Sequence, residues 1–116
     1  MIAKIYNEHG CINISESVIA TIAGMAAMEC YGLVGMASKR TTDGFVELLK
    51  KENLRKGVKI TQTDNKLIID LYVIIEYGVK ISVVAENIID KVKYYVEKQT
   101  GIKIDKINVI VESVRV

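Results

Sequence analysis

Three side chains in the sequence could support nucleophilic, acid–base or metal chemistry: His9, Cys11 and Cys30. His9 is the only histidine of the chain. A general base must lie within hydrogen-bond reach of a nucleophile or substrate, and the sequence indicates no such partner for this turn histidine. A zinc site built from the three residues would lack a fourth ligand and any Cys-x-x-Cys or His-x-x-x-His spacing. We therefore expect neither catalysis nor a metal or cofactor at these positions.

The remaining chemical motifs are also weak. Asp70 and Glu76 share one face of a predicted strand, but a separation of six residues places them about 20 Å apart, too far to act on one bond. The run Gly32-Leu33-Val34-Gly35 matches the Gly-x-x-Gly loop of nucleic-acid-binding KH modules. Its central residues are apolar and begin a predicted strand, so we interpret it as a helix end followed by a strand. No dinucleotide or Walker-type glycine loop is present, and we expect a protein that is not an enzyme.

Basic residues gather in the middle of the chain. Residues 39–66 contain eight basic and four acidic side chains, so this segment carries +4 while the whole chain carries +2. Such a segment could contact nucleic acid or an anionic membrane surface, or it could be the solvated side of a helix and its following loop. The candidate basic patch within 39–59 consists of Lys50, Lys51, Arg55, Lys56 and Lys59.

Length and composition set the frame for these residues. The 116 residues are 50% hydrophobic and contain no proline, enough for one core in a single domain spanning 1–116. No uncharged run approaches the roughly 20 apolar residues of a membrane span, and the N-terminus does not resemble a signal peptide. We therefore expect a cytoplasmic protein with reduced cysteines.

Hydrophobic periodicity predicts an α+β fold with the order β-α-β-α-β-β-α-β, a small mixed sheet and helices packed mainly on one face. A helix following Ser15 should end near Gly32, and a hairpin should join two strands at residues 64–66. The predicted elements are extended pieces at 2–6 and 11–14, helices at 15–30, 43–53 and 82–101, and strands at 33–37, 58–63, 67–77 and 103–114.

Two predicted surfaces are more apolar than a monomer needs. The first helix is apolar nearly all round, which requires cover on several sides. The long strand directs Leu67, Ile69, Leu71, Val73, Ile75 and Tyr77 to one face, which we assign to the core. Its other face should form an exposed apolar patch with the last strand, and such patches commonly mark association sites. The candidate interaction surface consists of Ile68, Tyr72, Ile74 and Ile110.

Several segments together resemble the alkaline shock protein and Gls-type envelope stress response family of Gram-positive bacteria. They include Gly10-Cys11-Ile12-Asn13-Ile14-Ser15, Gly32-Leu33-Val34-Gly35-Met36, Lys56-Gly57-Val58-Lys59-Ile60 and the run from Ile69 to Gly78. The resemblance implies a non-enzymatic cytoplasmic protein of envelope stress or homeostasis, placed peripherally at the inner face of the membrane through a membrane-anchored partner. It also implies self-association, so we expect a homo-oligomer and favour this function over nucleic-acid binding.

Overall fold

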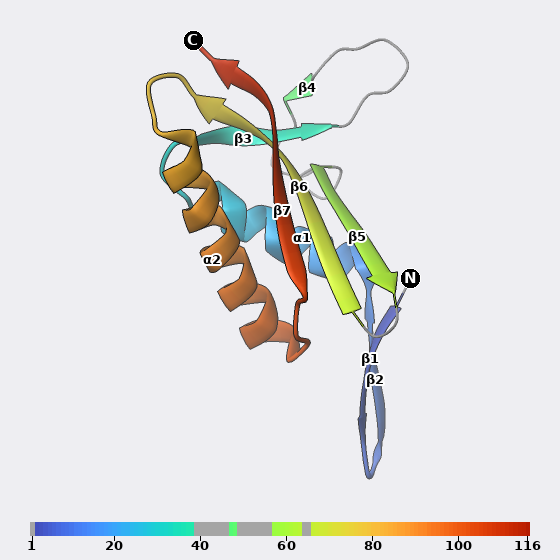
Figure 1. The fold of residues 1–116 in the computed structure, drawn as a ribbon. Coiled ribbons are helices and arrows are strands. Elements are labelled where there is room, and N and C mark those ends of the chain that lie inside the picture. Colours follow the sequence, from blue (N-terminus) through green and yellow to red (C-terminus); the bar gives the residue numbers. More distant parts are fainter. Residues whose placement is uncertain (1, 39–46, 49–56, 64–65) are drawn as a thin grey trace.

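The computed structural model describes residues 2–38, 47–48, 57–63 and 66–116. These residues form two helices, a separate two-stranded hairpin and a five-stranded sheet (Figure 1). The elements are β1 (Ile2–Asn7), β2 (Gly10–Ser15), α1 (Glu16–Met28), β3 (Leu33–Ser38), β4 (Glu47–Leu48), β5 (Val58–Thr63), β6 (Lys66–Glu76), α2 (Ile81–Thr100) and β7 (Lys106–Arg115). The α+β class predicted from the sequence is confirmed.

Strand β6 is the centre of the sheet. It forms the predicted antiparallel hairpin with β5, in a register that runs from Thr63 opposite Lys66 to Val58 opposite Leu71. On its other edge β7 runs parallel to it, from Ile68 opposite Lys106 to Glu76 opposite Arg115. Parallel neighbours require a crossover connection, and α2 supplies it.

The upper part of β6 has a different neighbour on the β5 edge. Residues 73–75 pair with β3 in antiparallel register, and these residues also pair with β7. Because β7 occupies one edge of β6 from Ile68 to Glu76, β5 and β3 share the opposite edge: β5 pairs with residues 66–71 and β3 with residues 73–75. The register of β7 shifts between Val73 and Ile74 of β6, and that of β3 shifts between Leu33 and Gly35, opposite Ile75 and Ile74. Both shifts follow the point at which the neighbour on the shared edge changes from β5 to β3.

Both helices pack on one face of this sheet, as predicted, and Figure 1 shows α1 crossing behind β6 and β7. The alternate residues of β6 that face the helices are fully buried, and α2 presents a buried stripe toward them at helical spacing. The centre of the core contains Ile19, Ala23, Ala27, Met36, Ile69, Leu71, Val73, Ile75, Ile88, Val92 and Val96.

The ends of the helices differ from the predictions in detail. Glu29, in right-handed conformation, is the C-cap of α1, and Gly32 adopts φ +89° only where the chain turns into β3. Lys80 rather than Ser82 stands at the N-cap of α2. Gly101 adopts φ +76° and donates its N–H to the carbonyl of Glu97, the left-handed cap expected there.

The predicted second helix is wrong where the structure describes it. Residues 47–48 form β4 and pair antiparallel with Ala37 and Ser38 of β3. Strand pairing with an available sheet edge overrides the local helical preference that the pattern suggested. The other residues of the predicted helix over 43–53 lie outside the described residues.

Candidate interaction surfaces

The predicted interaction surface lies on the sheet face opposite the helices. Tyr72 and Ile110 are register partners on adjacent strands, and Tyr72 and Ile74 form a second small core with Ala37. Tyr72 is only 7% exposed, while Ile68 and Ile110 are half-buried. The expectation of an exposed patch is therefore wrong at its centre, because residues of the same chain already cover Tyr72 and Ile74.

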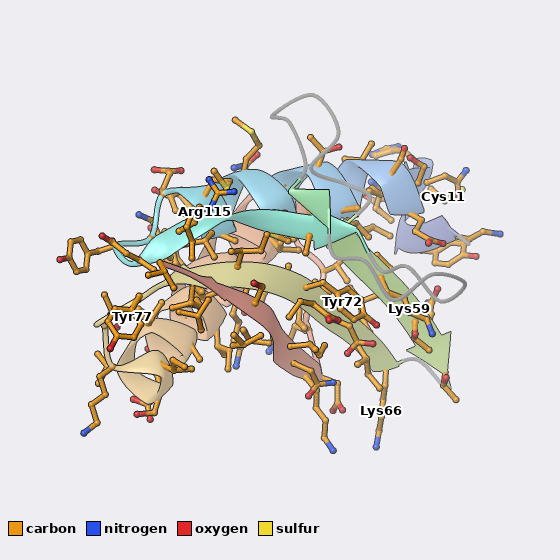
Figure 2. The ribbon with its side chains drawn as sticks, turned by 90° about the horizontal axis from the view of Figure 1, so that it is seen from above. Cys11, Lys59, Lys66, Tyr72, Tyr77 and Arg115 are labelled. Atoms are coloured by element: carbon orange, nitrogen blue, oxygen red, sulfur yellow. The ribbon has the colours of Figure 1, made fainter. Side chains whose placement is uncertain are left out.

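Of the candidate basic patch, Lys59 is described. It lies exposed on β5 opposite Asp70 of β6, and Figure 2 labels it on this strand. Asp70 also accepts a 2.8 Å hydrogen bond from the side-chain amide of Asn108 on β7. Lys50, Lys51, Arg55 and Lys56 lie outside the described residues, so the basic patch stays a prediction.

The structure does not bring the two cysteines and the histidine together. His9 lies exposed at the β1–β2 turn, 3.4 Å from the carboxylate of Glu8. Cys11 is exposed on β2, whereas Cys30 is buried in the core after α1. Burial raises the pKa of the Cys30 thiol above its ordinary value of 9.0, against the opposing effect of nearby Lys91. Among the described residues no group of three or more side chains is arranged to hold a metal ion.

The solvent side of α1 combines the polar Ser17 and Thr21 with large apolar side chains. Val18, Met25 and Met28 are exposed large hydrophobic residues along this helix. Next to them a shallow groove of about 190 Å³ runs between α1 and α2. We call it the helix groove; its lining includes Thr21, Ile22, Met25, Glu29, Tyr95 and Gln99.

A second exposed apolar surface, the distal patch, consists of Tyr31 and Val83, and Tyr77 and Ile81 are further exposed hydrophobic residues at the β6–α2 connection and the start of α2. The distal patch forms where the α1–β3 and β6–α2 connections meet, and it adjoins a depression of about 310 Å³ lined in part by Tyr31, Lys80 and Val83. Tyr31 is 82% exposed and Tyr77 is 69% exposed. The assignment of Tyr77 to the core is wrong, because β6 ends at Glu76 and the chain turns at Gly78. The glycine that follows Tyr77 in the sequence was the signal that the strand ends before this residue.

The β1–β2 hairpin, which we call the arm, extends away from the body of the molecule (Figure 1). Ile5 lies opposite Ile12 and Tyr6 lies opposite Cys11. Ile5 is half-buried near Gly101, about midway along the arm. Its partner Ile12 is 50% exposed, and Tyr6, one pair closer to the turn, is 72% exposed. The sequence indicated these strands and their turn, but not that they leave the sheet.

Fold and surface together define a small α+β protein with several exposed apolar surfaces. The chain belongs to the alkaline shock protein 23 family, described by its cell envelope-related function, whose model matches residues 4–116. The family suggested by the sequence is thereby confirmed.

Two of the relatives from Gram-positive bacteria match over nearly their whole length. The chain is 47% identical to the uncharacterized protein YloU of Bacillus subtilis, covering 100% of this chain and 98% of that protein. It is 45% identical to the uncharacterized protein Spy1614 of Streptococcus pyogenes, covering 100% of this chain and 97% of that protein. A search of the solved structures finds no significant match. Neither helix in the described part of the chain has the length and apolar character needed to span a membrane.

Proposed function

We propose that this protein is a non-enzymatic interaction protein of the cell envelope that associates with itself and docks on a membrane-anchored partner at the inner face of the membrane. The family supplies the envelope-related role. Self-association and docking are the functions that the exposed apolar surfaces support best, because contiguous apolar surface that a monomer leaves in water commonly marks a binding site.

The helix groove carries this proposal. An amphipathic helix normally directs polar side chains to solvent, yet α1 exposes Val18, Met25 and Met28, and Met25 lines the groove together with Ile22 and Tyr95. Methionine side chains adapt their shape to different partners, which suits a binding surface. The Lys91 ammonium lies 3.8 Å from the Glu29 carboxylate between the two helices. The groove thus offers an apolar floor with an ion pair at its edge.

Light scattering on the purified protein tests self-association. We expect Met25→Glu to lower the average mass of the associated protein, because a charge in the groove would have to be desolvated on contact. Gln62→Glu, at an exposed position of β5, introduces the same change in charge away from the groove and should leave the mass unchanged. A wild-type protein that stays monomeric, or equal effects of the two substitutions, would refute self-association through the groove.

Docking on a membrane-anchored partner is tested by co-sedimentation with membrane vesicles. We expect binding to vesicles from cells that make this protein, loss of binding after the vesicle proteins are removed by protease, and no binding to protein-free liposomes. Equal binding to liposomes containing anionic lipid would instead support direct contact with the membrane surface and contradict docking on a protein.

A further inference from the structure

Strand β7 forms one border of the five-stranded sheet. In the described part of the chain it pairs with β6 alone, and Figure 1 shows it at the side of the sheet, with β6 and then β5 beyond it. A strand directs alternate backbone N–H and C=O groups to each of its edges, so half of those of β7 point away from β6. Such a row of groups is a template on which a further strand can pair.

The first half of this free edge lacks the features that usually protect an exposed strand. Proteins blunt such edges with proline, charged side chains, bulges or very short strands. Residues 107–111 contain neither proline nor charge, and the pairing with β6 is regular from Lys106 to Val111. β5, on the other side of β6, carries Lys59 within its six residues. The regular part of β7 therefore offers an open edge of about the usual strand length.

The core-facing side chains of β7 are incompletely covered. Ile107, Val109 and Val111 pack against the core, yet each is only half-buried. Their register partners in the same layer of β6 are fully buried: Ile69, Leu71 and Val73. The difference arises because β6 has strands on both edges, whereas β7 has one on a single edge. A strand added to the free edge would cover the remaining apolar surface.

Helix α2 provides a floor for such a strand. It packs against β7, whereas α1 packs against β5 and β3, so one side of α2 lies toward the free edge. Glu97 marks this side, because its carboxylate accepts the N–H of Ile104 just before β7. Lys93, Ile89 and Ala85 precede it in one row at intervals of four residues, which is about 6 Å and close to the roughly 6.7 Å between alternate residues of a strand. Helix-facing side chains of an added strand would therefore meet Ile89 and Ala85, which are both half-buried.

A symmetric pair of copies does not fit this edge. Two copies joined antiparallel through β7 would share a twofold axis perpendicular to the sheet, so both α2 helices would lie on the same face. Neighbouring strands are about 4.8 Å apart, whereas packed helices keep about 8–10 Å between their axes. Because α2 packs beneath β7, the two helices would overlap. The edge is suited instead to an extended segment that brings no helix of its own to this face.

We propose that an extended segment of another protein adds as a strand to β7 along residues 106–111, with apolar side chains at alternate positions seated on Ile89 and Ala85 of α2. In this mode of recognition, main-chain hydrogen bonds supply affinity and the seats for alternate side chains supply specificity. The contact goes beyond the proposed function, because it uses a different surface: the helix groove lies on the side of α2 that faces α1.

Peptide binding followed by NMR tests this contact on the full chain with Met25→Glu, which removes association through the helix groove. The probe is the acetylated and amidated peptide Lys-Thr-Val-Thr-Val-Thr-Lys. The control peptide, Thr-Lys-Thr-Val-Val-Lys-Thr, has the same composition without the alternation. We expect the probe at millimolar concentration to slow hydrogen exchange at alternate amides within residues 106–111. No slowing by the probe, or equal slowing by the control, would overturn the proposal.

Backbone methylation of the probe tests the hydrogen bonds directly. With the valines directed to α2, either the valine or the threonine N–H groups point to β7, and the direction of the bound strand decides which. One probe is therefore methylated on the valine nitrogens and another on the threonine nitrogens. We expect one of the two to lose binding and the other to keep it, which also gives the strand direction. Equal binding by both, or by neither, would contradict pairing with the edge.

A pair of substitutions on α2 tests the seat. Ile89→Lys should raise the Kd of the probe roughly tenfold, because an apolar contact is lost. Val83→Lys, at a position that is 47% exposed on the same helix, adds the same charge outside the row and should leave the Kd unchanged. Urea unfolding checks that both variants are folded. Equal Kd values for the two variants would refute the seat on Ile89.

The same NMR measurement distinguishes a second copy from a foreign segment. Slowing of the 106–111 amides that grows with protein concentration in the absence of peptide would show that a copy of this chain occupies the edge, and would overturn the proposal. This inference and the proposed function can fail separately. Loss of probe binding leaves the light-scattering result for the helix groove unchanged, and a monomeric wild-type protein leaves the peptide result unchanged.

Discussion

Replacing Gly32 with alanine should destabilise the protein more than replacing Gly78 with alanine, although both glycines have a positive φ. The angles are +89° at Gly32 and +94° at Gly78. A side chain in this region costs about 1–3 kcal/mol of backbone strain, which both substitutions share. Their surroundings differ. A Cβ on Gly32 would lie 2.8 Å from Val84 Cγ2, whereas a Cβ on Gly78 meets nothing within 4 Å.

The crowding at Gly32 gives the expected difference. Val84 is only 4% exposed on α2 and packs in the core, so moving its methyl group away from a new Cβ disturbs its other contacts. Inserting atoms into a packed core costs about 1–3 kcal/mol. We therefore expect Gly78→Ala to lower the free energy of unfolding by about 1–3 kcal/mol and Gly32→Ala to lower it by about 2–6 kcal/mol.

Urea unfolding followed by circular dichroism measures both values, at protein concentrations low enough to keep each variant monomeric. Shortening Val84 makes room for the new methyl group, so Gly32→Ala and Val84→Ala should be less than additive. We expect a coupling of about 1–2 kcal/mol in the double-mutant cycle. Equal losses for the two glycine variants, together with an additive cycle, would refute the assignment of the difference to contact with Val84.

Two further predictions concern buried residues. Tyr72→Glu should lower the free energy of unfolding by about 3 kcal/mol or more, because it places a charge in a covered position. A loss below about 1 kcal/mol in urea unfolding would show that the sheet face is open. Cys11 should react rapidly with a disulfide reagent and Cys30 slowly, because Cys30 is buried and its thiol has a raised pKa. Below pH 9.0 the folded and unfolded states both keep the Cys30 proton, whereas above it the unfolded chain loses the proton first. The free energy of unfolding should therefore fall with rising pH relative to a Cys30→Ala variant, and parallel curves for the two proteins would contradict this.

Strands and helices with one buried side could be predicted well from the sequence. β5 has the predicted bounds of Val58 and Thr63, and α2 ends at Thr100 with Gly101 as the C-terminal cap that the sequence indicated. Alternation in β6 correctly assigned its core-facing residues up to Ile75. In these elements local pattern and tertiary burial agree, so the sequence alone is informative.

Features that depend on tertiary pairing could not be predicted in the same way. β4 has two residues and exists as a strand through its pairing with β3. The buried cluster around Tyr72 includes Ala37, which lies 35 positions earlier in the chain. The distal patch joins Tyr31 to residues near 80, and hydrophobic periodicity carries no information on which connections meet. Candidate binding surfaces were therefore harder to place than strands and helices.

The division of one edge of β6 between β5 and β3 has a consequence for amide hydrogen exchange. Two segments of β6 have a strand on both edges: residues 68–71 lie between β5 and β7, and residues 73–75 lie between β3 and β7. Separation of β5 leaves the β3 and β7 contacts in place, and separation of β3 leaves those of β5 and β7. Each amide of β6 points to one edge of the strand, so separation of β5 exposes only the amides that point to β5, and those that point to β7 stay bonded. Amides of β6 on the β7 edge should therefore exchange with solvent more slowly than those on the shared edge, and amides of the arm, a two-stranded hairpin, should exchange through local opening.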